Sequence, residues 1–381
     1  MQQTVNIPLP GSKPHYDLLD GLRGVAAIMV IWYHFFEGFA TSPFDQKFNH
    51  GYLAVDFFFA LSGFVIAYAY DDRWKKGLTY GEFILRRLIR LQPMVVLGVV
   101  LGVISFLLQG SQTWEHEHVS IEAVMLSVLL GLFMIPSLPG ALPEVRGNGE
   151  MFPLNGPSWS LFFEYIASIA YCYILHKISD GKLKVVTLLF AIGLAAAAIF
   201  NFSGYYHLGV GWSMADYGFF GGLLRVGFSF SIGMLMARNF KPIKVKGAFW
   251  WCTLIIVSII CVPYIGYPEH QWLNGLFDAV CTIFVFPFVV WLGASGTTTD
   301  RNSTRICEFL GRLSYPIYII HYPVMYYLYY TVWENGYTFS QLWPVIIALF
   351  IGIILMAMAA LKFYDEPVRK WLSSKYIKVK K

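Results

Sequence analysis

Eleven long apolar stretches divide the sequence, and each is close to the length that a helix needs to cross a lipid bilayer. About 30 Å of hydrocarbon requires ~20 helical residues. The stretches lie at about 22–40, 52–70, 93–109, 121–138, 158–176, 183–200, 216–237, 248–266, 275–293, 313–333 and 342–363. Because lipid offers the backbone no hydrogen-bond partners, these segments are expected to be helices.

The composition agrees with that pattern. Of 381 residues, 57% are hydrophobic and only 13% are charged, whereas soluble domains have about a quarter of their residues charged. The fold class we predict is all-α, a polytopic transmembrane helix bundle. The five cysteines form no Cys-x-x-Cys pair, so neither disulfides nor a structural zinc site is expected, and no metal is predicted elsewhere.

Lysine and arginine residues indicate how the bundle is oriented. They cluster at 71–92, 177–184, 238–246, 301–312 and 369–381, whereas the intervening loops hold only Lys47 and Arg146. By the positive-inside rule the clusters face the cytosol, and both termini lie there. Such a bias fits a bacterial plasma (inner) membrane.

This orientation requires one apolar stretch not to span. The basic loops at 71–92 and 177–182 need an even number of crossings between them, yet three stretches intervene. The short stretch 121–138, which is followed closely by prolines, is the first choice, and 93–109 is the alternative. We predict about ten crossings plus one re-entrant or outward-lying helix, with the loop 139–157 facing outside.

We expect one membrane domain, at 21–365. Before it lies a cytosolic N-terminal segment, 1–20, which contains prolines and aspartates and does not resemble a secretory signal. After it lies a basic cytosolic tail, 366–381.

Arg23 and His34 are the first candidates for chemistry. Eleven residues of helix make about three turns and rise ~16 Å, so both side chains lie on one face, at different depths. A buried histidine can accept a proton from a hydroxyl nucleophile. The alternative is a structural histidine bonded to a neighbouring helix.

Arg87 and Arg90 share a helix face just before the third stretch, and two guanidiniums there can hold a phosphate. Ordinary membrane anchoring is the alternative. Glu164 lies about two turns into the fifth stretch and needs a partner, for which His34 and Arg225 are candidates. With Asp278, these groups suggest one shared polar cavity, although structural ion pairs between helices are the alternative. Further residues that could line this cavity are Asp56, Ser62, Trp159, Ser160, Tyr318 and His321.

Taken in order, these motifs resemble the membrane acyltransferase-3 family. They are Arg23-x10-His34, the block from Asp56 to Phe64 with Ser62, Arg87-x-x-Arg90-x-x-Pro93, Trp159-Ser160-Leu161-x-x-Glu164, Ser314-Tyr315-Pro316 through His321, and Tyr364-Asp365-Glu366-Pro367-Val368-Arg369. The resemblance covers nearly the whole sequence.

The resemblance implies an O-acyltransferase that takes an acyl group, usually acetyl, from acyl-coenzyme A. The acceptor is a hydroxyl of a glycan or a lipid-linked saccharide. Arg23, Arg87 and Arg90 would hold the donor, His34 would be the catalytic histidine, and Glu164 would assist it. Direct transfer and an acyl-histidine intermediate both remain open. Some family members carry a fused hydrolase-like domain, which this sequence does not show, so a separate periplasmic or extracellular partner is the alternative to direct transfer.

Two other functions use the same charged groups. A secondary transporter would use His34, Glu164 and Arg225 as a proton relay, and a glycan-lipid flippase would use them to bind a headgroup. No matching halves are found in the sequence, the linkers are too short to hold a separate soluble domain, and no nucleic acid partner is expected. Membrane lipid and the glycan acceptor are the predicted partners.

Overall fold

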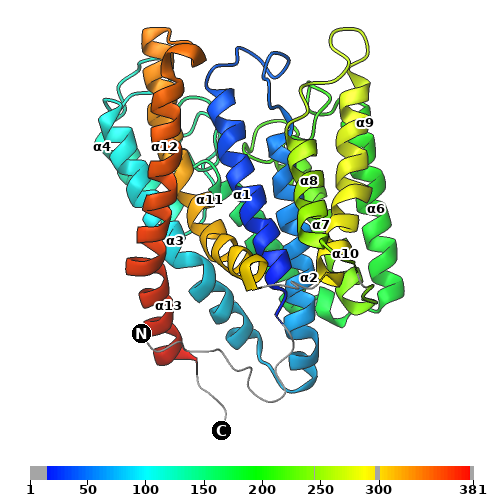
Figure 1. The fold of residues 1–381 in the computed structure, drawn as a ribbon. Coiled ribbons are helices and arrows are strands. Elements are labelled where there is room, and N and C mark those ends of the chain that lie inside the picture. Colours follow the sequence, from blue (N-terminus) through cyan, green and yellow to red (C-terminus); the bar gives the residue numbers. More distant parts are fainter. Residues whose placement is uncertain (1–14, 244, 297–300, 378–381) are drawn as a thin grey trace.

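A computed structural model describes residues 15–243, 245–296 and 301–377, and within that part of the chain the regular elements are helices (Figure 1). They are α1 (Asp17–Glu37), α2 (Ala54–Lys75), α3 (Tyr80–Leu108), α4 (Ile121–Leu132), α5 (Ser158–Tyr173), α6 (Asp180–Ile199), α7 (Gly218–Arg238), α8 (Ala248–Ile260), α9 (Trp272–Val280), α10 (Phe286–Ser295), α11 (Arg301–Asn335), α12 (Phe339–Ala360) and α13 (Glu366–Tyr376). Short turns of 3-10 helix lie at His50–Leu53 and Leu175–Lys177. Single π turns join α9 to α10 and α12 to α13.

Every predicted apolar stretch coincides with a helix, and the predicted all-α membrane bundle is confirmed. Seven of the described helical segments are long and apolar enough to cross a bilayer, among them 180–199 and 218–238. Two apolar helices are shorter, α4 and α8. The count of ten crossings remains a prediction.

The helix α4 is the segment that our topology argument singled out. It has 12 residues, a rise of only ~18 Å, and it lies at the upper left of the bundle (Figure 1). In contrast, α3 has 29 residues and contains all but the last residue of the alternative stretch 93–109. Of the two stretches considered, 121–138 is therefore the one with the shorter helix, and its failure to span remains a prediction.

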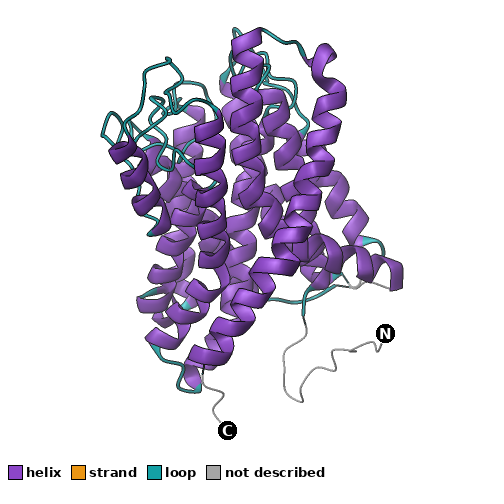
Figure 2. Ribbon diagram, turned by 90° about the vertical axis from the view of Figure 1, so that its left-hand side faces the viewer, coloured by secondary structure: helices purple, strands orange, loops and turns teal. Residues whose placement is uncertain are grey.

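The two ends of the bundle differ in character. Figure 2 shows that the long loops gather at the upper end, whereas the start of α1 and the end of α13 lie at the lower end. The C-terminal end of α2 and the start of α11, both rich in arginine and lysine, also lie at the lower end. We call it the basic end.

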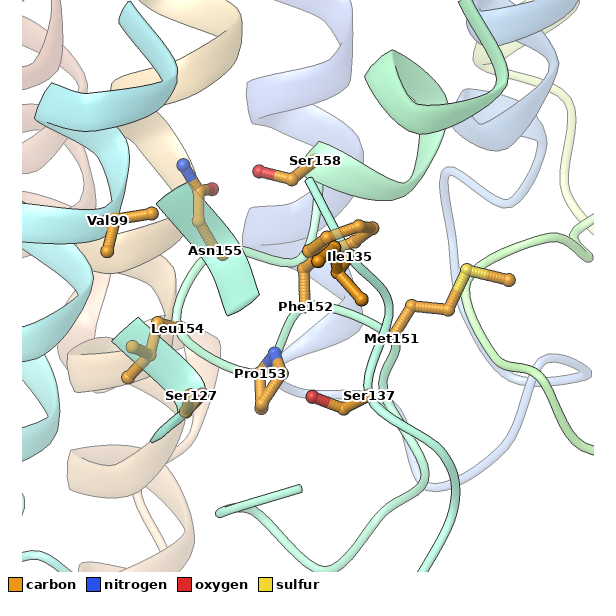
Figure 3. A pocket seen from close by; sticks show the side chains of 11 residues that line it. Val99, Ser127, Ile135, Ser137, Met151, Phe152, Pro153, Leu154, Asn155 and Ser158 are labelled. Carbon is orange, nitrogen blue, oxygen red and sulfur yellow. The ribbon is translucent and has the colours of Figure 1, made fainter. Parts of the chain in front are cut away.

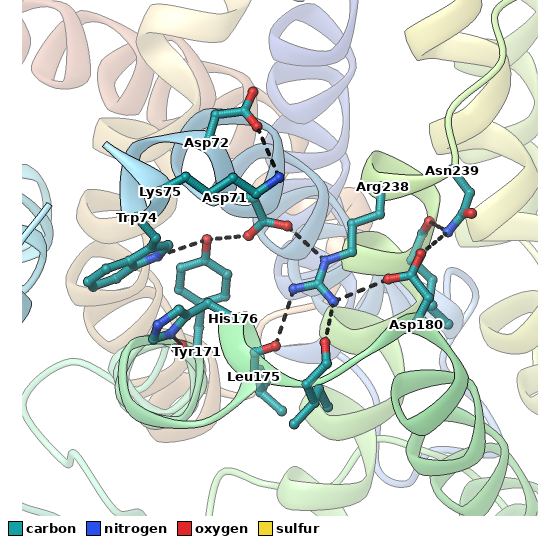
Figure 4. A network of polar contacts seen from close by, with 12 residues as sticks. Asp71, Asp72, Trp74, Lys75, Tyr171, Leu175, His176, Asp180, Arg238 and Asn239 are labelled. Carbon is teal, nitrogen blue, oxygen red and sulfur yellow. Dashed lines mark hydrogen bonds and ion pairs between the residues drawn. The ribbon is translucent and has the colours of Figure 1, made fainter. Parts of the chain in front are cut away.

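A network around Arg238 ties four helices together at the basic end (Figure 4). Its guanidinium binds Asp71 at 2.7 Å and Asp180 at 3.3 Å, and Asp71 also accepts a hydrogen bond from the Tyr171 hydroxyl at 2.6 Å. Arg238 further donates to the carbonyl of Leu175. These contacts hold the ends of α2, α5, α6 and α7 together, largely by charge-assisted bonds.

Helices α1 and α11 pack closely because α1 presents glycines to α11. A side chain added at Gly24 would lie 2.4 Å from the carbonyl oxygen of Leu310, and one added at Gly21 would meet Cys307 at 2.8 Å. Small residues let two membrane helices approach at backbone distance. This contact brings the polar face of α1 against α11.

The loop 139–157 folds back into the bundle. Arg146 is 1% exposed and donates hydrogen bonds to the carbonyl of Pro153 and to the Gln109 side chain, at 2.6 and 2.7 Å. Its guanidinium also stacks on the Tyr326 ring of α11. A small pocket between this loop, α3 and α4, with Asn155 and Phe152 on its wall, is shown in Figure 3. It has room for about one water molecule.

The segment predicted to be a basic tail forms α13 over Glu366–Tyr376, and part of it lines the cavity described next. Of the predicted N-terminal segment, residues 1–14 lie outside the described residues, as do residues 378–381 of the tail and Lys244 of a basic cluster.

Candidate active site

A cavity of about 1910 Å³ opens at the basic end of the bundle. Side chains of α1, α2, α3, α5, α11 and α13 line it. At its mouth lie exposed residues such as Arg305 and Lys370, and its inner end is formed by the buried residues Ser160 and Tyr318. Thirteen residues of α11 separate Arg305 from Tyr318, a rise of ~20 Å. We call this space the arginine cavity.

All three arginines predicted to hold the donor line the arginine cavity. The side chain of Arg23 binds Asp20 at 2.8 Å and donates to the Ser314 hydroxyl of α11 at 2.9 Å. Arg90 forms no ion pair with a described side chain, although Arg23 and Arg369 are both near enough to interact with its charge. Arg90 is thus the arginine here that is open to an anionic ligand.

Arg87 is already paired. Its guanidinium forms an ion pair with Glu164 of α5, and it donates a second hydrogen bond to the Ser168 hydroxyl at 3.2 Å. The Ser62 hydroxyl of α2 donates to the same carboxylate at 2.9 Å. Since Glu164 satisfies Arg87, this arginine holds the cavity wall in shape and leaves Glu164 and Ser62 facing the cavity.

His15 adds a positive charge at the cavity mouth. It precedes α1, and its ring bonds Asp17 at 2.7 Å and Asp20 at 3.1 Å. The hydrogen bond to Asp20 is the main reason why the pKa of His15 is raised to about 9. The imidazole is therefore protonated at neutral pH.

The inner end of the arginine cavity is closed by a pair of hydroxyls. Tyr318 Oη lies 2.8 Å from Ser160 Oγ. Behind Tyr318, at a ring-centre separation of 5.9 Å, lies His321, which is fully buried. The His321 Nδ1 atom lies 3.2 Å from the Ile317 carbonyl, and its Nε2 atom has no hydrogen-bond partner among the described residues.

His34 is the next ring in this series. It stacks on His321 with ring centres 5.3 Å apart, and the Tyr322 ring meets it edge-on at 4.8 Å. His34 does not line the arginine cavity. Its side chain is 16% exposed. Arg23 and His34 do share a face of α1, as predicted, because both contact α11.

Glu37 is the carboxylate that faces His34. Its Oε2 atom lies 2.6 Å from His34 Nδ1 and accepts a hydrogen bond from the Tyr329 hydroxyl at 2.8 Å. A proton on Nδ1 that is held by a carboxylate leaves Nε2 as the basic nitrogen. The pair is therefore suited to general base catalysis.

The predicted shared cavity of Glu164, His34, Arg225 and Asp278 is wrong. Arg225 pairs with Asp56 at 2.8 Å, with both side chains 1% exposed or less. Asp278 accepts hydrogen bonds from the Tyr52 hydroxyl and from the backbone of residue 208. These separate contacts match the structural ion pairs that we considered as the alternative.

The eight residues proposed to line the cavity are divided in the same way. Ser62, Ser160 and Tyr318 line the arginine cavity, whereas Asp56, Trp159, Arg225, Asp278 and His321 do not. Trp159 packs on the guanidinium of Arg225, with 5.1 Å between the guanidinium carbon and the ring centre. Trp159 thus packs against the structural ion pair of Arg225 and Asp56.

Sequence reasoning missed Glu37. It lies three residues after His34, and that spacing puts two helical side chains in contact. The i, i+3 spacing of His34 and Glu37 is a local signal that could have identified Glu37 from the sequence. Tyr329 carried no local signal, because its role depends on a contact with a distant part of the chain.

The fold and the site thus define a helical membrane protein with a cationic cavity at one end and a half-buried carboxylate–histidine pair beyond the inner end of that cavity. The comparison with known proteins is more specific. The acyltransferase domain of the acyltransferase-3 family matches residues 16–362. The chain belongs to this family.

Several curated proteins are similar to the chain. It is 34% identical over 188 residues to "Protein 2 in picA locus" of Rhizobium radiobacter, a match that covers 48% of this chain and 93% of that protein. It is 24% identical to the O-acetyltransferase OatA of Staphylococcus aureus over 92% of this chain. It is 26% identical to the "Putative peptidoglycan O-acetyltransferase YrhL" of Bacillus subtilis, again over 92% of this chain.

The chain spans little more than half the length of the two O-acetyltransferases, 57% of OatA and 54% of YrhL. No solved structure gives a significant match.

Proposed function

We propose that this protein transfers an acyl group, most simply acetyl, from cytosolic acyl-coenzyme A across the membrane to a hydroxyl of a glycan or lipid-linked saccharide. The observation that carries the proposal is the His34–Glu37 pair, which stands one stacked ring beyond the inner end of the arginine cavity. In this arrangement a thioester would enter the bundle from the basic end, and the acceptor alcohol would reach His34 from the opposite end.

The arginine cavity supports the choice of donor. Coenzyme A carries phosphates that cannot enter lipid, and arginine is well suited to bind them. Arg23 and Arg90 line the cavity, and its length of ~20 Å along α11 suits a slender arm that carries the thioester inward.

The names of the relatives support the proposed identities of the acyl group and of the acceptor. The S. aureus relative is an O-acetyltransferase, and the name of the B. subtilis relative specifies peptidoglycan. Acetyl and a glycan hydroxyl are therefore the proposed acyl group and acceptor class. Transfer directly to that hydroxyl and transfer through a separate partner outside the membrane both remain predictions.

The chemistry follows from the geometry of His34. Nε2 takes the proton from the acceptor hydroxyl as its oxygen attacks the thioester carbonyl. The carbon–sulfur bond then breaks, and the thiolate of coenzyme A takes that proton back from Nε2. Glu37 stabilises the imidazolium between the two steps, and Tyr329 holds Glu37 in place.

The thioester must first pass Tyr318. Because Tyr318 and His321 stand between the arginine cavity and His34, the hydrogen bond from Tyr318 to Ser160 has to open for the acyl group to reach the imidazole. Tyr318 is buried, so this opening requires the side chains packed around it, including His321, to move as well. Tyr318 would thus limit access of water from the cytosol to the reacting groups.

The test is mass spectrometry of cell-envelope glycans together with binding of coenzyme A to the purified protein in lipid nanodiscs. We expect O-acetyl esters to disappear when the protein is absent and to return with the wild type, and we expect coenzyme A to bind. A protein that binds no coenzyme A and whose loss leaves every ester in place would contradict the proposal. Solute uptake driven by a proton gradient, without any donor, would favour a transporter instead.

A further inference from the structure

The charges around the mouth of the arginine cavity do not cancel. Eight lysine and arginine residues and six aspartate and glutamate residues line the cavity. Four of the carboxylates pair with arginines, in the pairs Asp20–Arg23, Glu164–Arg87, Glu366–Arg312 and Asp365–Arg369. The lining cations outside these pairs are Arg86, Arg90, Arg305 and Lys370, against the carboxylates Asp17 and Glu308.

One of these cations has a polar atom that is buried and unused. The Nε atom of Arg86 is shielded from solvent and has no hydrogen-bond partner among the described residues. A buried donor without a partner is costly, so it favours a ligand that accepts hydrogen bonds. The mouth thus has both an excess of positive charge and an unsatisfied donor.

Helix α13 completes this mouth. An ion pair of 2.7 Å between Arg312 and Glu366 fixes it to α11, and Arg369 bonds Asp365 at 3.0 Å within its first turn. Arg369 is also near enough to Arg90 of α3 for their charges to interact. Arg369 and Lys370 thus line the same cavity from α13, which packs against α3.

We propose that Arg369 and Lys370, together with Arg86, form a second anion subsite at the cavity mouth, which binds the phosphate of the donor that is farthest from the thioester. This inference rests on the proposed function. In coenzyme A that phosphate is the 3′-phosphate of the adenosine. The subsite is separate from Arg23, Arg87 and Arg90 deeper in the cavity.

The length of the cavity supports this assignment. When the thioester lies at the inner end beside Ser160 and Tyr318, the nucleotide end of the donor is ~20 Å away, at the level of Arg305. A phosphate there meets Lys370 and Arg369, whose donors can form charge-assisted hydrogen bonds to it. The subsite would thus select phosphorylated nucleotide donors over shorter thioesters.

The experiment compares coenzyme A with 3′-dephospho-coenzyme A by titration into the protein in nanodiscs of zwitterionic lipid. We expect the wild type to bind coenzyme A about tenfold or more tightly than the dephospho form, the range for loss of charge-assisted hydrogen bonds. In Arg369→Gln/Lys370→Gln, which leaves only Arg86 of the subsite, coenzyme A should lose most of its advantage over the dephospho form, whose own affinity stays unchanged.

Two matched variants sharpen the result. Lys375→Gln removes a charge from the same helix at a position outside the cavity lining, so it should keep the full preference. Lys370→Gln alone leaves the Arg369–Asp365 pair intact and should lose part of the preference. Unchanged binding of the dephospho form shows that each variant is folded.

A double variant that keeps the wild-type preference, or a wild type without one, would overturn the subsite while leaving the proposed function in place. Failure of the wild type to bind either ligand would instead refute the proposed function. The phosphate of a lipid headgroup could bind the same cations in place of the phosphate of the donor. If phosphatidylglycerol in the nanodisc abolishes the preference, the subsite binds lipid and the inference is wrong.

Discussion

Oε2 of Glu37 lies 2.6 Å from Nδ1 of His34, one turn further along the same helix. The contact is local in sequence, yet a residue from the far end of the chain completes it, because the hydroxyl of Tyr329 donates to the same carboxylate oxygen at 2.8 Å. The imidazole is therefore held by both α1 and α11. This relationship gives the proposed base its orientation.

Glu37→Gln should lower the turnover number for acyl transfer by about 10²–10⁴-fold, because the amide no longer stabilises the imidazolium. Affinity for coenzyme A should stay the same, since Glu37 does not line the arginine cavity. Tyr329→Phe, which removes one hydrogen bond and keeps the carboxylate, should cost about fivefold. Steady-state assays with titration of coenzyme A measure both. Equal loss in binding and turnover would show that Glu37 is merely structural.

Arg90→Gln should weaken coenzyme A binding by about tenfold, because Arg90 is open to a ligand. Arg87→Gln should act differently, since it strips Glu164 of its partner and destabilises the fold as well. The matched variant Arg87→Gln/Glu164→Gln should recover part of the stability, with a coupling free energy of ~0.5–3 kcal/mol. Binding titrations and thermal unfolding in detergent separate the two effects. Purely additive effects of the two substitutions on stability would refute the pairing.

The buried pair of Asp56 and Arg225 should matter for stability and not for donor binding. Asp56→Ala leaves a guanidinium without its carboxylate among helices, and should cost about 3–5 kcal/mol of unfolding free energy. In Asp56→Ala/Arg225→Met both charges are gone, so the loss should be smaller. Thermal unfolding in detergent tests the order of the three proteins. If Asp56→Ala unfolds at the wild-type temperature, the pair is not a structural one.

Thiol labelling tests the membrane orientation. A cysteine in place of Lys375, at the end of α13, should react with an impermeant maleimide only in inside-out vesicles. A cysteine in place of Asn335, at the opposite end of α11, should react only in right-side-out vesicles. The wild type controls for the five native cysteines, of which only Cys261 is partly exposed. Labelling of both positions from one side would reject the topology.

Much of the fold could be predicted because apolar length is a local property. A run of ~20 apolar residues must form a helix in lipid whatever surrounds it, and each predicted run does so. The short helix α4 followed from counting charges around it. Helix α13 could not be found in this way, because Glu366–Tyr376 is polar and joins the bundle only through contacts such as Arg312–Glu366.

The site was predictable only in part, for the same physical reason. The residue types and their faces were visible, so Arg23 and His34 were correctly assigned to one side of α1. The partners of these residues that are distant in sequence could not be identified in this way. From the sequence alone, Glu164 could pair with any buried cation. Its partner is Arg87 because α3 packs against α5 in the folded protein.

The most direct test of the account is His34→Ala, assayed for acyl transfer and for coenzyme A binding in the same nanodisc preparation. Since His34 lies beyond the arginine cavity, the variant should bind coenzyme A with wild-type affinity and should transfer no acyl group to glycan. Glycan acylation at the wild-type rate by folded His34→Ala protein would contradict the account.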